Sequence, residues 1–291
     1  MSFIAFILIY PILFLISILP FRLLYIFSDF VYVLIYYIIG YRKKVVRANI
    51  AMALPHLSEK ERLIIEKKSY KHLCDMFLEM IKTMTISIKE IERRFVIKNL
   101  DEFLEIEKKN KSVALMCAHY ASYEWVVSMN GRVSFQGFAI YKKINNPYFD
   151  KLVKKIRSRF KAYLITTKET RGVIEQNESK GNHAIYGFAS DQSPQVKPQT
   201  YWSKFMGIEV PVYVGAEVLS KKYNMNVVFL KVKKVKRGFY EADIELISDD
   251  VNTVPDYQIT ETFLRKVEKQ IHEAPEFYLW THKRWKHRMK K

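Results

Sequence analysis

The first forty residues of the chain contain almost no charged side chains. Residues 3–19 carry no charge, and residues 1–40 as a whole contain only Arg22 and Asp29. A helix formed by residues 3–19 spans about 26 Å, close to the ~30 Å hydrocarbon core of a bilayer. No basic segment precedes the apolar run and no small-residue cleavage site follows it, which argues against a removable signal peptide. A buried core helix is the alternative, but length and composition favour a membrane anchor.

The second apolar segment leads directly into a basic one. Residues 23–40 are rich in tyrosine, and the basic segment YRKKVVR begins at residue 41. Positive charge beside an apolar segment keeps that end in the cytoplasm. We expect one anchoring helix, an interfacial helix, and then a cytoplasmic body. A two-span hairpin is the alternative, and it leaves the body on the same side.

The rest of the chain is strongly basic. The sequence has 48 Lys and Arg against 30 Asp and Glu, a formal net charge of +18, and the whole excess lies in residues 41–291. Such a body indicates an anionic partner, and nucleic acid, acidic lipid head groups and an acidic carrier protein all qualify. The two cysteines, Cys74 and Cys117, give neither a disulfide framework nor metal-ligand spacing.

The predicted body is one α/β domain, with a helical lead-in over residues 41–94 and an α/β core over residues 95–291. In the lead-in, Ser58 and Glu61 are spaced as a capping box at the start of a long helix. In the core, short apolar runs alternate with polar helical stretches, which predicts a mostly parallel central sheet flanked by helices. The last two strands should form an antiparallel hairpin at one edge. The expected strands are 113–118, 135–141, 183–189, 226–232 and 240–247, and the expected helices are 122–130, 146–160, 168–179 and 213–223.

A histidine directly follows the first of these core strands. His119 comes after the apolar run 113–118, and Glu124 follows five positions later. Sites in open α/β sheets lie at the carboxyl ends of strands. If Glu124 holds the proton on one ring nitrogen, the other nitrogen of His119 is free to act as a base. The spacing alone does not decide this, because His56 and Glu61 have the same separation. A structural histidine at a strand end stays open.

Four later segments give the pair a context. They are IYKKINNPYFDKLVKKIRSR, KETRGVIEQNESKGNHAIYGFASDQ, FMGIEVPVYVGAEVLSKKYN and, the most specific of them, APEFYLWTHKRWKHR. With the His-x-x-x-x-Glu pair and the apolar amino-terminal segment, these segments resemble, in collinear order, the bacterial lipid A biosynthesis acyltransferases. These are the lauroyl and myristoyl transferases of the wider lysophospholipid and glycerolipid acyltransferase superfamily. Lys283 and Trp285 stand where an arginine and a phenylalanine are commoner in the family.

The resemblance implies an O-acyltransferase that moves a fatty acyl chain from an acyl carrier protein thioester to a hydroxyl of an anionic glycolipid, a lipid A precursor. His119 would be the general base and Glu124 would orient it. No cofactor is implied, and no third His, Asp or Glu stands at a spacing that suggests a metal site. Cys117 is expected to be a buried strand residue rather than a nucleophile. The implied substrate-binding residues are Asn146, Arg157, Arg159, Asp191 and Gln192.

The implied location is the inner membrane, with residues 1–40 as anchor and interfacial helix and residues 41–291 as a cytoplasmic acyltransferase domain. The implied partners are the carrier protein, the glycolipid and the membrane, with no nucleic acid. Other functions stay open at this point. They are an acyltransferase for a lysophospholipid or an aminolipid, a non-catalytic membrane-anchored binder of polyanions, and an anchor protein with an inactive site.

Overall fold

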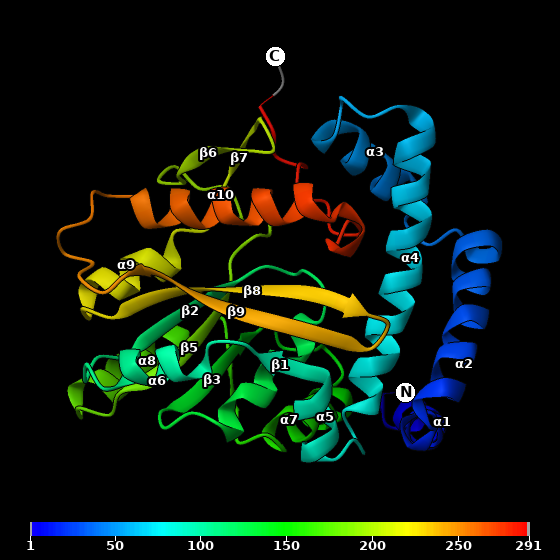
Figure 1. Cartoon of the computed structure of the whole chain (residues 1–291), viewed down its shortest axis with the longest axis horizontal. Helices are drawn as coiled ribbons and strands as arrows, with labels where there is room; N and C mark the ends of the chain where they lie inside the picture. The colour runs from blue at the N-terminus through cyan, green and yellow to red at the C-terminus, as the bar shows by residue number, and fades with distance from the viewer. Residues whose placement is uncertain (1, 290–291) are drawn as a thin grey trace.

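A seven-stranded sheet runs through the middle of the molecule (Figure 1). The structure is a computed structural model that describes residues 2–289. The strands are β1 (Phe95–Ile97), β2 (Val113–Cys117), β3 (Gln136–Tyr141), β4 (Tyr163–Thr166), β5 (Ala184–Ala189), β8 (Asn226–Lys236) and β9 (Phe239–Ser248), and β6 (Trp202–Phe205) with β7 (Ile208–Pro211) forms a separate two-stranded sheet.

The order of the strands in the large sheet is β1-β9-β8-β2-β5-β3-β4. Every neighbouring pair is parallel except β8 with β9, so the predicted α/β class with a mostly parallel sheet is confirmed. The antiparallel hairpin does not lie at the edge, because β1 pairs in parallel with the outer side of β9. At three residues, β1 is too short for its apolar pattern to be recognised in the sequence.

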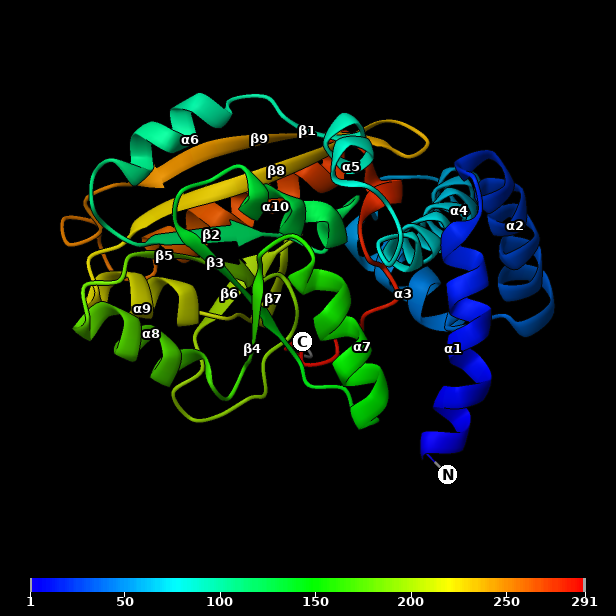
Figure 2. The same cartoon turned by 90° about the horizontal axis from the view of Figure 1, so that it is seen from below.

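Helices cover both the sheet and one of its ends (Figures 1 and 2). They are α1 (Ser2–Ile18), α2 (Phe21–Val33), η1 (Leu34–Ile39), α3 (Lys43–Ala53), α4 (Glu59–Lys82), α5 (Ile88–Arg94), α6 (Leu100–Glu107), η2 (Tyr123–Gly131), α7 (Pro147–Ser158), α8 (Thr170–Ser179), α9 (Gly215–Lys222), α10 (Gln258–Glu273) and η3 (Pro275–Phe277). In both views α1 to α4 gather at the end of the sheet where the β8–β9 hairpin turns.

The long helix α4 starts as its sequence predicts. The Ser58 hydroxyl accepts a hydrogen bond from the Glu61 backbone N–H, and the Glu61 carboxylate accepts one from the Ser58 backbone N–H. The capping box is therefore confirmed, and it satisfies two N–H groups that a helix start otherwise leaves unpaired. The helix then runs between the amino-terminal helices and the sheet, so it contributes side chains to both.

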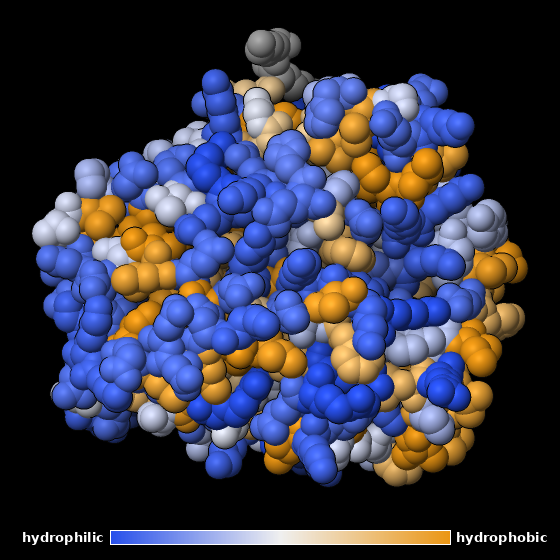
Figure 3. All heavy atoms as spheres, in the orientation of Figure 1, coloured by the Kyte–Doolittle hydropathy of each residue, from blue (hydrophilic) through white to orange (hydrophobic). Residues whose placement is uncertain are grey.

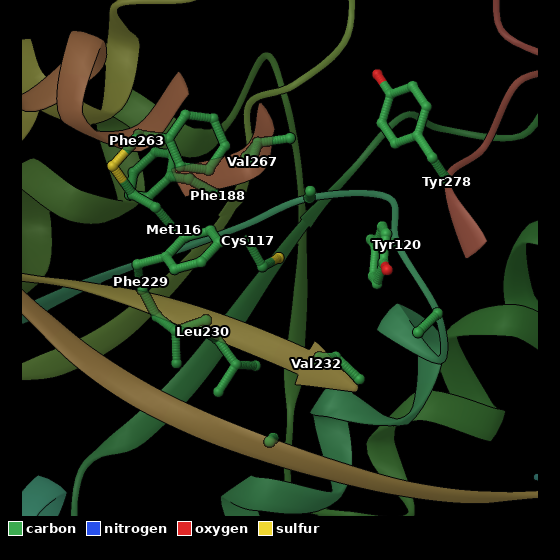
Figure 4. Packing of buried hydrophobic residues seen from close by; sticks show 14 of the residues in the cluster. Met116, Cys117, Tyr120, Phe188, Phe229, Leu230, Val232, Phe263, Val267 and Tyr278 are labelled. Atoms are coloured by element: carbon green, nitrogen blue, oxygen red, sulfur yellow. The ribbon is translucent and has the colours of Figure 1, made fainter. Parts of the chain in front are cut away.

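The core of the sheet is packed with large apolar side chains (Figure 4). Met116 on β2 and Phe229 on β8 lie beside Phe263 and Val267 of α10, and all four are at most 1% exposed. Each such side chain stabilises the fold by about 1.5–3 kcal/mol relative to leaving it in water. This packing fixes the carboxyl end of β2, where the chain leaves the sheet.

The amino-terminal helices keep a large apolar surface exposed. Phe21–Ile39 is the one helix of the described residues that is long and apolar enough to cross a membrane, and α1 falls short of that length. One face of α2 and η1 is buried, including Leu24 and Tyr36, while the opposite face exposes Ile26 and Phe30. Figure 3 shows hydrophobic side chains along the right edge of the molecule, where α2 lies in Figure 1. The division of residues 1–40 into anchor and interfacial helix stays a prediction.

Candidate active site

His119 and Asp191 meet at the carboxyl ends of two neighbouring strands. In the parallel pairing of β2 with β5, Cys117 lies opposite Ala189. His119 and Asp191 each follow two residues later, so the register places them side by side. Asp191 Oδ1 lies 2.7 Å from His119 Nδ1 and accepts a hydrogen bond of 3.1 Å from the His119 backbone N–H. The Asp191 side chain is 1% exposed and that of His119 is 20% exposed, so the histidine is the accessible member of the pair.

The charge of Asp191 controls the charge of His119. Burial lowers the pKa of His119, but attraction to Asp191 and the hydrogen bond between them outweigh burial, and the pKa is raised above its ordinary value. The same contact lowers the pKa of Asp191. Burial raises that pKa, but the attraction of His119 and the hydrogen bonds to the carboxylate outweigh burial. Because Nδ1 is held by the carboxylate, Nε2 is the ring nitrogen that a substrate can meet.

Glu124 lies near His119 but binds a different partner. The Arg157 guanidinium donates to both Glu124 carboxylate oxygens, at 2.7 and 2.9 Å from Nη2. Arg157 lies in the last turn of α7. Its planar guanidinium group can donate to both oxygens of a carboxylate at once, as it does here. We expected the Glu124 carboxylate to hold one nitrogen of the histidine ring. In the structure the Asp191 carboxylate holds it. Glu124 still acts through space, because its charge also raises the pKa of His119.

The other residues expected to bind substrate have mainly structural contacts. Arg159 donates to the backbone carbonyls of Thr83 and Ile86, which follow the end of α4. The side-chain oxygen of Asn146 accepts from the N–H groups of the first turn of α7, as an N-cap does. Gln192 is half-buried beside Asp191. The structure therefore brings Asp191 into contact with His119 and places the Arg157–Glu124 pair close by, while Arg159 and Asn146 hold the fold together.

The carboxyl-terminal segment packs over His119. The Leu279 backbone N–H donates to the His119 carbonyl at 3.1 Å, and the Ala121 N–H donates to the Phe277 carbonyl at 2.9 Å. From α3, the Asn49 side chain donates to the carbonyls of Trp280 and His282. The segment that resembles the family signature is thus part of the site.

His282 is a second histidine near the pair, and the sequence analysis did not single it out. Its Nε2 accepts a hydrogen bond from the Ser193 backbone N–H at 3.3 Å. Burial lowers the pKa of His282 to about 4, against the attraction of Asp191, so this ring is neutral at neutral pH. The signal that could have found it is its place within the THKRWKHR segment.

A small pocket with a volume of about 20 Å³ opens beside His119. Apolar side chains of α4 and of the carboxyl-terminal segment dominate its walls, and the Tyr123 and His119 rings pack edge to face at 4.9 Å between centroids. The lining residues are Val46, Ser69, Tyr70, His72, Leu73, Met76, His119, Tyr123, Phe277, Tyr278, Leu279, Trp280 and Thr281. The pocket thus gives the accessible face of the histidine a mainly apolar surrounding.

The thiol next to the site is buried and protonated. Cys117 lies in the core of β2 (Figure 4), and burial raises the pKa of its thiol to about 12. Within the described part of the chain, no three His, Cys, Asp or Glu side chains gather in a way that could bind a metal ion. His119 and Asp191 are the titratable pair in direct contact at this end of β2.

The comparison with protein families covers nearly the whole chain. The model described as "Bacterial lipid A biosynthesis acyltransferase" matches residues 2–287. The chain belongs to this family. Its enzyme class is therefore an O-acyltransferase of lipid A biosynthesis, and the match includes the apolar amino-terminal helices as well as the α/β core.

Curated relatives of this acyltransferase are similar over most of their length but at low identity. The chain is 25% identical over 252 residues to the lipid A biosynthesis palmitoleoyltransferase of Escherichia coli K12, covering 85% of this chain and 79% of the relative. It is 23% identical over 249 residues to the lipid A biosynthesis lauroyltransferase of the same organism, covering 85% and 80%. A lipid A biosynthesis acyltransferase of Haemophilus influenzae is 22% identical, with 85% and 78% covered.

Proposed function

We propose that this acyltransferase moves a fatty acyl chain from an acyl carrier protein thioester to a hydroxyl of a lipid A precursor, with His119 as the general base. The observation that carries the proposal is the His119–Asp191 pair at the mouth of an apolar pocket. Family membership and the names of the relatives support the acceptor class.

Each step of the transfer has a group to perform it. Nε2 of His119 takes the proton of the acceptor hydroxyl while its oxygen attacks the thioester carbonyl carbon. The new C–O bond forms, the C–S bond breaks, and the imidazolium returns the proton to the leaving sulfur. Asp191 fixes the ring tautomer and stabilises the imidazolium, and Glu124 adds negative potential from a greater distance. The protein needs no nucleophile of its own, because the acceptor hydroxyl attacks directly.

The surroundings of the pair suit this reaction at a membrane. The pocket beside His119 is lined mainly by apolar side chains of α4 and the carboxyl-terminal segment, a surrounding that suits the start of an acyl chain. The exposed apolar face of α2 supports a body that lies at the bilayer surface. The basic segment after residue 40 supports the cytoplasmic side of the inner membrane for that body.

The test is acyl transfer by the full chain in detergent or nanodiscs, with acyl carrier protein thioester as donor. His119→Ala should lower kcat by roughly 10²- to 10⁴-fold, the usual contribution of a general base. Cys117→Ala is the matched control on the same strand, and it should keep most of the activity. Mass spectrometry of the glycolipid should show the gain of one acyl chain with the wild type and with Cys117→Ala, and little or none with His119→Ala.

Three results would contradict the proposal. Undiminished turnover by His119→Ala would remove the histidine from the mechanism. Loss of activity in both variants would point to a damaged fold or a role for the thiol. If the wild type acylated a lysophospholipid or an aminolipid in place of the lipid A precursor, the acceptor would be wrong while the mechanism stood.

A further inference from the structure

A second hollow opens between α4 and the tip of the β8–β9 hairpin. It has a volume of about 340 Å³, and cationic side chains dominate its lining. In Figure 3 hydrophilic side chains gather around the hairpin tip, beside the hydrophobic right edge. We call it the cationic groove, and its lining is Lys68, Lys71, His72, Asp75, Lys234, Val235, Lys236, Arg237, Glu276 and Phe277.

Two of the five cations in the groove are neutralised within the protein. Arg237 binds the carboxylates of Asp75 and Asp29, and Lys234 lies 3.4 Å from Asp75. Both Arg237 and Lys234 thus contact Asp75, the buried carboxylate of the groove, and these two cations have a structural role.

The other three cations are exposed lysines. Lys68 Nζ lies 3.6 Å from Glu276, a surface pair of little strength, and no carboxylate of the described residues lies within 4.0 Å of Lys71 or Lys236. Five cations thus face two carboxylates, Asp75 and Glu276, in the lining of the groove. The excess charge belongs to Lys68, Lys71 and Lys236, and it is open to solvent.

The groove and the pocket beside His119 share a wall. His72 and Phe277 line both hollows, and their rings pack against each other at 4.9 Å between centroids. A ligand with its anionic end among the lysines therefore lies one layer of side chains from the pocket. Of the arginines expected to bind substrate, Arg157 and Arg159 already bind a carboxylate and backbone carbonyls. The groove offers the free positive charge that these two arginines lack.

The groove also borders the apolar surface of the amino-terminal helices. Arg237 in its lining donates to the Tyr25 carbonyl and to Asp29, both on α2. The outer face of the same helix exposes Ile26 and Phe30. When that face lies in lipid, the groove lies at the level of the head groups.

We propose that the cationic groove binds the phosphate groups of the membrane-embedded glycolipid acceptor, so that its hydroxyl reaches His119. The proposal rests on the proposed function for the identity of the acceptor. Lysines suit this task, since a compact ammonium group near a membrane surface attracts an anionic lipid head group. A concave groove beside lipid fits a phosphate head group better than an acidic carrier protein, because a protein partner needs about 800 Å² of matching surface.

The test compares two triple variants of the full chain. One changes Lys68, Lys71 and Lys236 to Gln. The matched control changes Lys108, Lys168 and Lys180 to Gln, which removes the same charge from exposed lysines that line neither the groove nor the pocket beside His119. KM is measured for the phosphorylated acceptor, for the same glycolipid with its phosphates removed, and for the acyl carrier protein.

The groove triple should raise KM for the phosphorylated acceptor by at least about tenfold, and more than it lowers kcat. It should leave KM for the dephosphorylated acceptor and for the carrier protein near the wild-type values, as the control should for all three substrates. A rise in KM for the carrier protein instead would assign the groove to the donor and overturn the proposal. Equal behaviour of the two triples would overturn it as well.

A binding measurement separates this proposal from the proposed function. If the wild type transfers no acyl chain, the chain is floated with phosphatidylcholine vesicles with and without phosphatidic acid, whose head group is a phosphomonoester. Stronger binding of the wild type than of the groove triple, only with phosphatidic acid, would support a phosphate site although the reaction was wrong. Identical binding of the wild type and the groove triple to vesicles with phosphatidic acid would contradict the phosphate site itself.

Discussion

At the scale of single residues, the site depends on which carboxylate touches His119. Asp191 contacts both the ring and the backbone of His119, whereas Glu124 is held by Arg157. The raised pKa of His119 keeps the ring protonated to a higher pH than an ordinary histidine. Since a general base must start unprotonated, activity should rise with pH through that pKa.

Asp191→Asn should move the acid limb of the kcat/KM profile to lower pH. The sign follows from the cause: the carboxylate raises the pKa of His119, so removing its charge lowers that pKa and frees the base in more acidic solution. The maximal rate should fall by roughly 10²- to 10⁴-fold, because the imidazolium loses its counter-charge. The measurement is a pH–rate profile, with Glu124→Gln as a control that shifts the limb in the same direction by less. An unmoved limb in Asp191→Asn would refute the pairing.

The sequence was sufficient to place His119 but not its partner. An apolar run ending in a histidine indicates a strand end, and the structure has it there. The partner depends on β2 lying next to β5, and β3 and β4 come between those two strands along the chain. Asp191 was expected in the site as a substrate-binding residue, yet its contact with the ring is a product of strand order. Arg159 was expected to bind substrate, but its use of backbone carbonyls follows from where α4 ends.

At the scale of elements, one turn joins the amino-terminal helices to the sheet. Gly238, at the tip of the β8–β9 hairpin, has a φ of 73°, and a Cβ there would lie 1.9 Å from the Tyr25 hydroxyl oxygen of α2. Next to it, Arg237 connects Asp29 on α2 with Asp75 on α4. The approach is so close that only glycine fits, and the adjacent arginine ties three elements together.

Arg237→Ala should lower the free energy of unfolding by roughly 2–3 kcal/mol. Asp75 is 3% exposed, and losing its main cation leaves a buried carboxylate whose remaining partners among the described residues are Lys234 and the Ser28 hydroxyl. The measurement is denaturant or thermal unfolding in a fixed detergent. Arg93→Ala is the matched control, since its ion pair with Glu90 lies on the surface and should contribute about 0–1 kcal/mol. Equal losses in the two variants would contradict the bridging role of Arg237.

The sequence patterns missed the short strands of the core, and they also missed the 16-residue helix α10. The five strands with long apolar runs were all predicted within a few residues, but β4, β6 and β7 have only four residues each. The helix expected over residues 122–130 is a 3-10 helix, η2. Runs this short are decided by their neighbours in the sheet rather than by local periodicity.

At the scale of the whole molecule, the apolar surface and the site lie on the same side of the sheet. The helices α1 and α2 stand next to α4 at the end of the sheet where the β8–β9 hairpin turns (Figure 2). Residues of α4 in turn line the pocket beside His119. A lipid substrate held by α2 and the groove is therefore already close to His119.

Changing Leu23, Ile26 and Phe30 together to Ser should lower binding to lipid vesicles by about tenfold or more without unfolding the chain. These side chains are 51%, 66% and 64% exposed, so they contribute to lipid contact rather than to the core. Flotation measures the bound fraction, and the melting temperature checks the fold. Tyr163, Val218 and Leu246 are exposed apolar residues on β4, α9 and β9, and their change to Ser is the control. Equal flotation of the two variants would show that α2 does not carry membrane binding.

The position of the carboxyl-terminal segment over His119 has a consequence for how the molecule is made. Residues 277–281 form one wall of the pocket, and they are synthesised long after α1 and α2. A growing chain thus acquires its membrane-seeking surface early and its closed site late. A chain interrupted before residue 277 would hold every strand of the sheet and still lack the wall that shapes the pocket. Premature termination there should yield a protein that reaches the bilayer and cannot work on it.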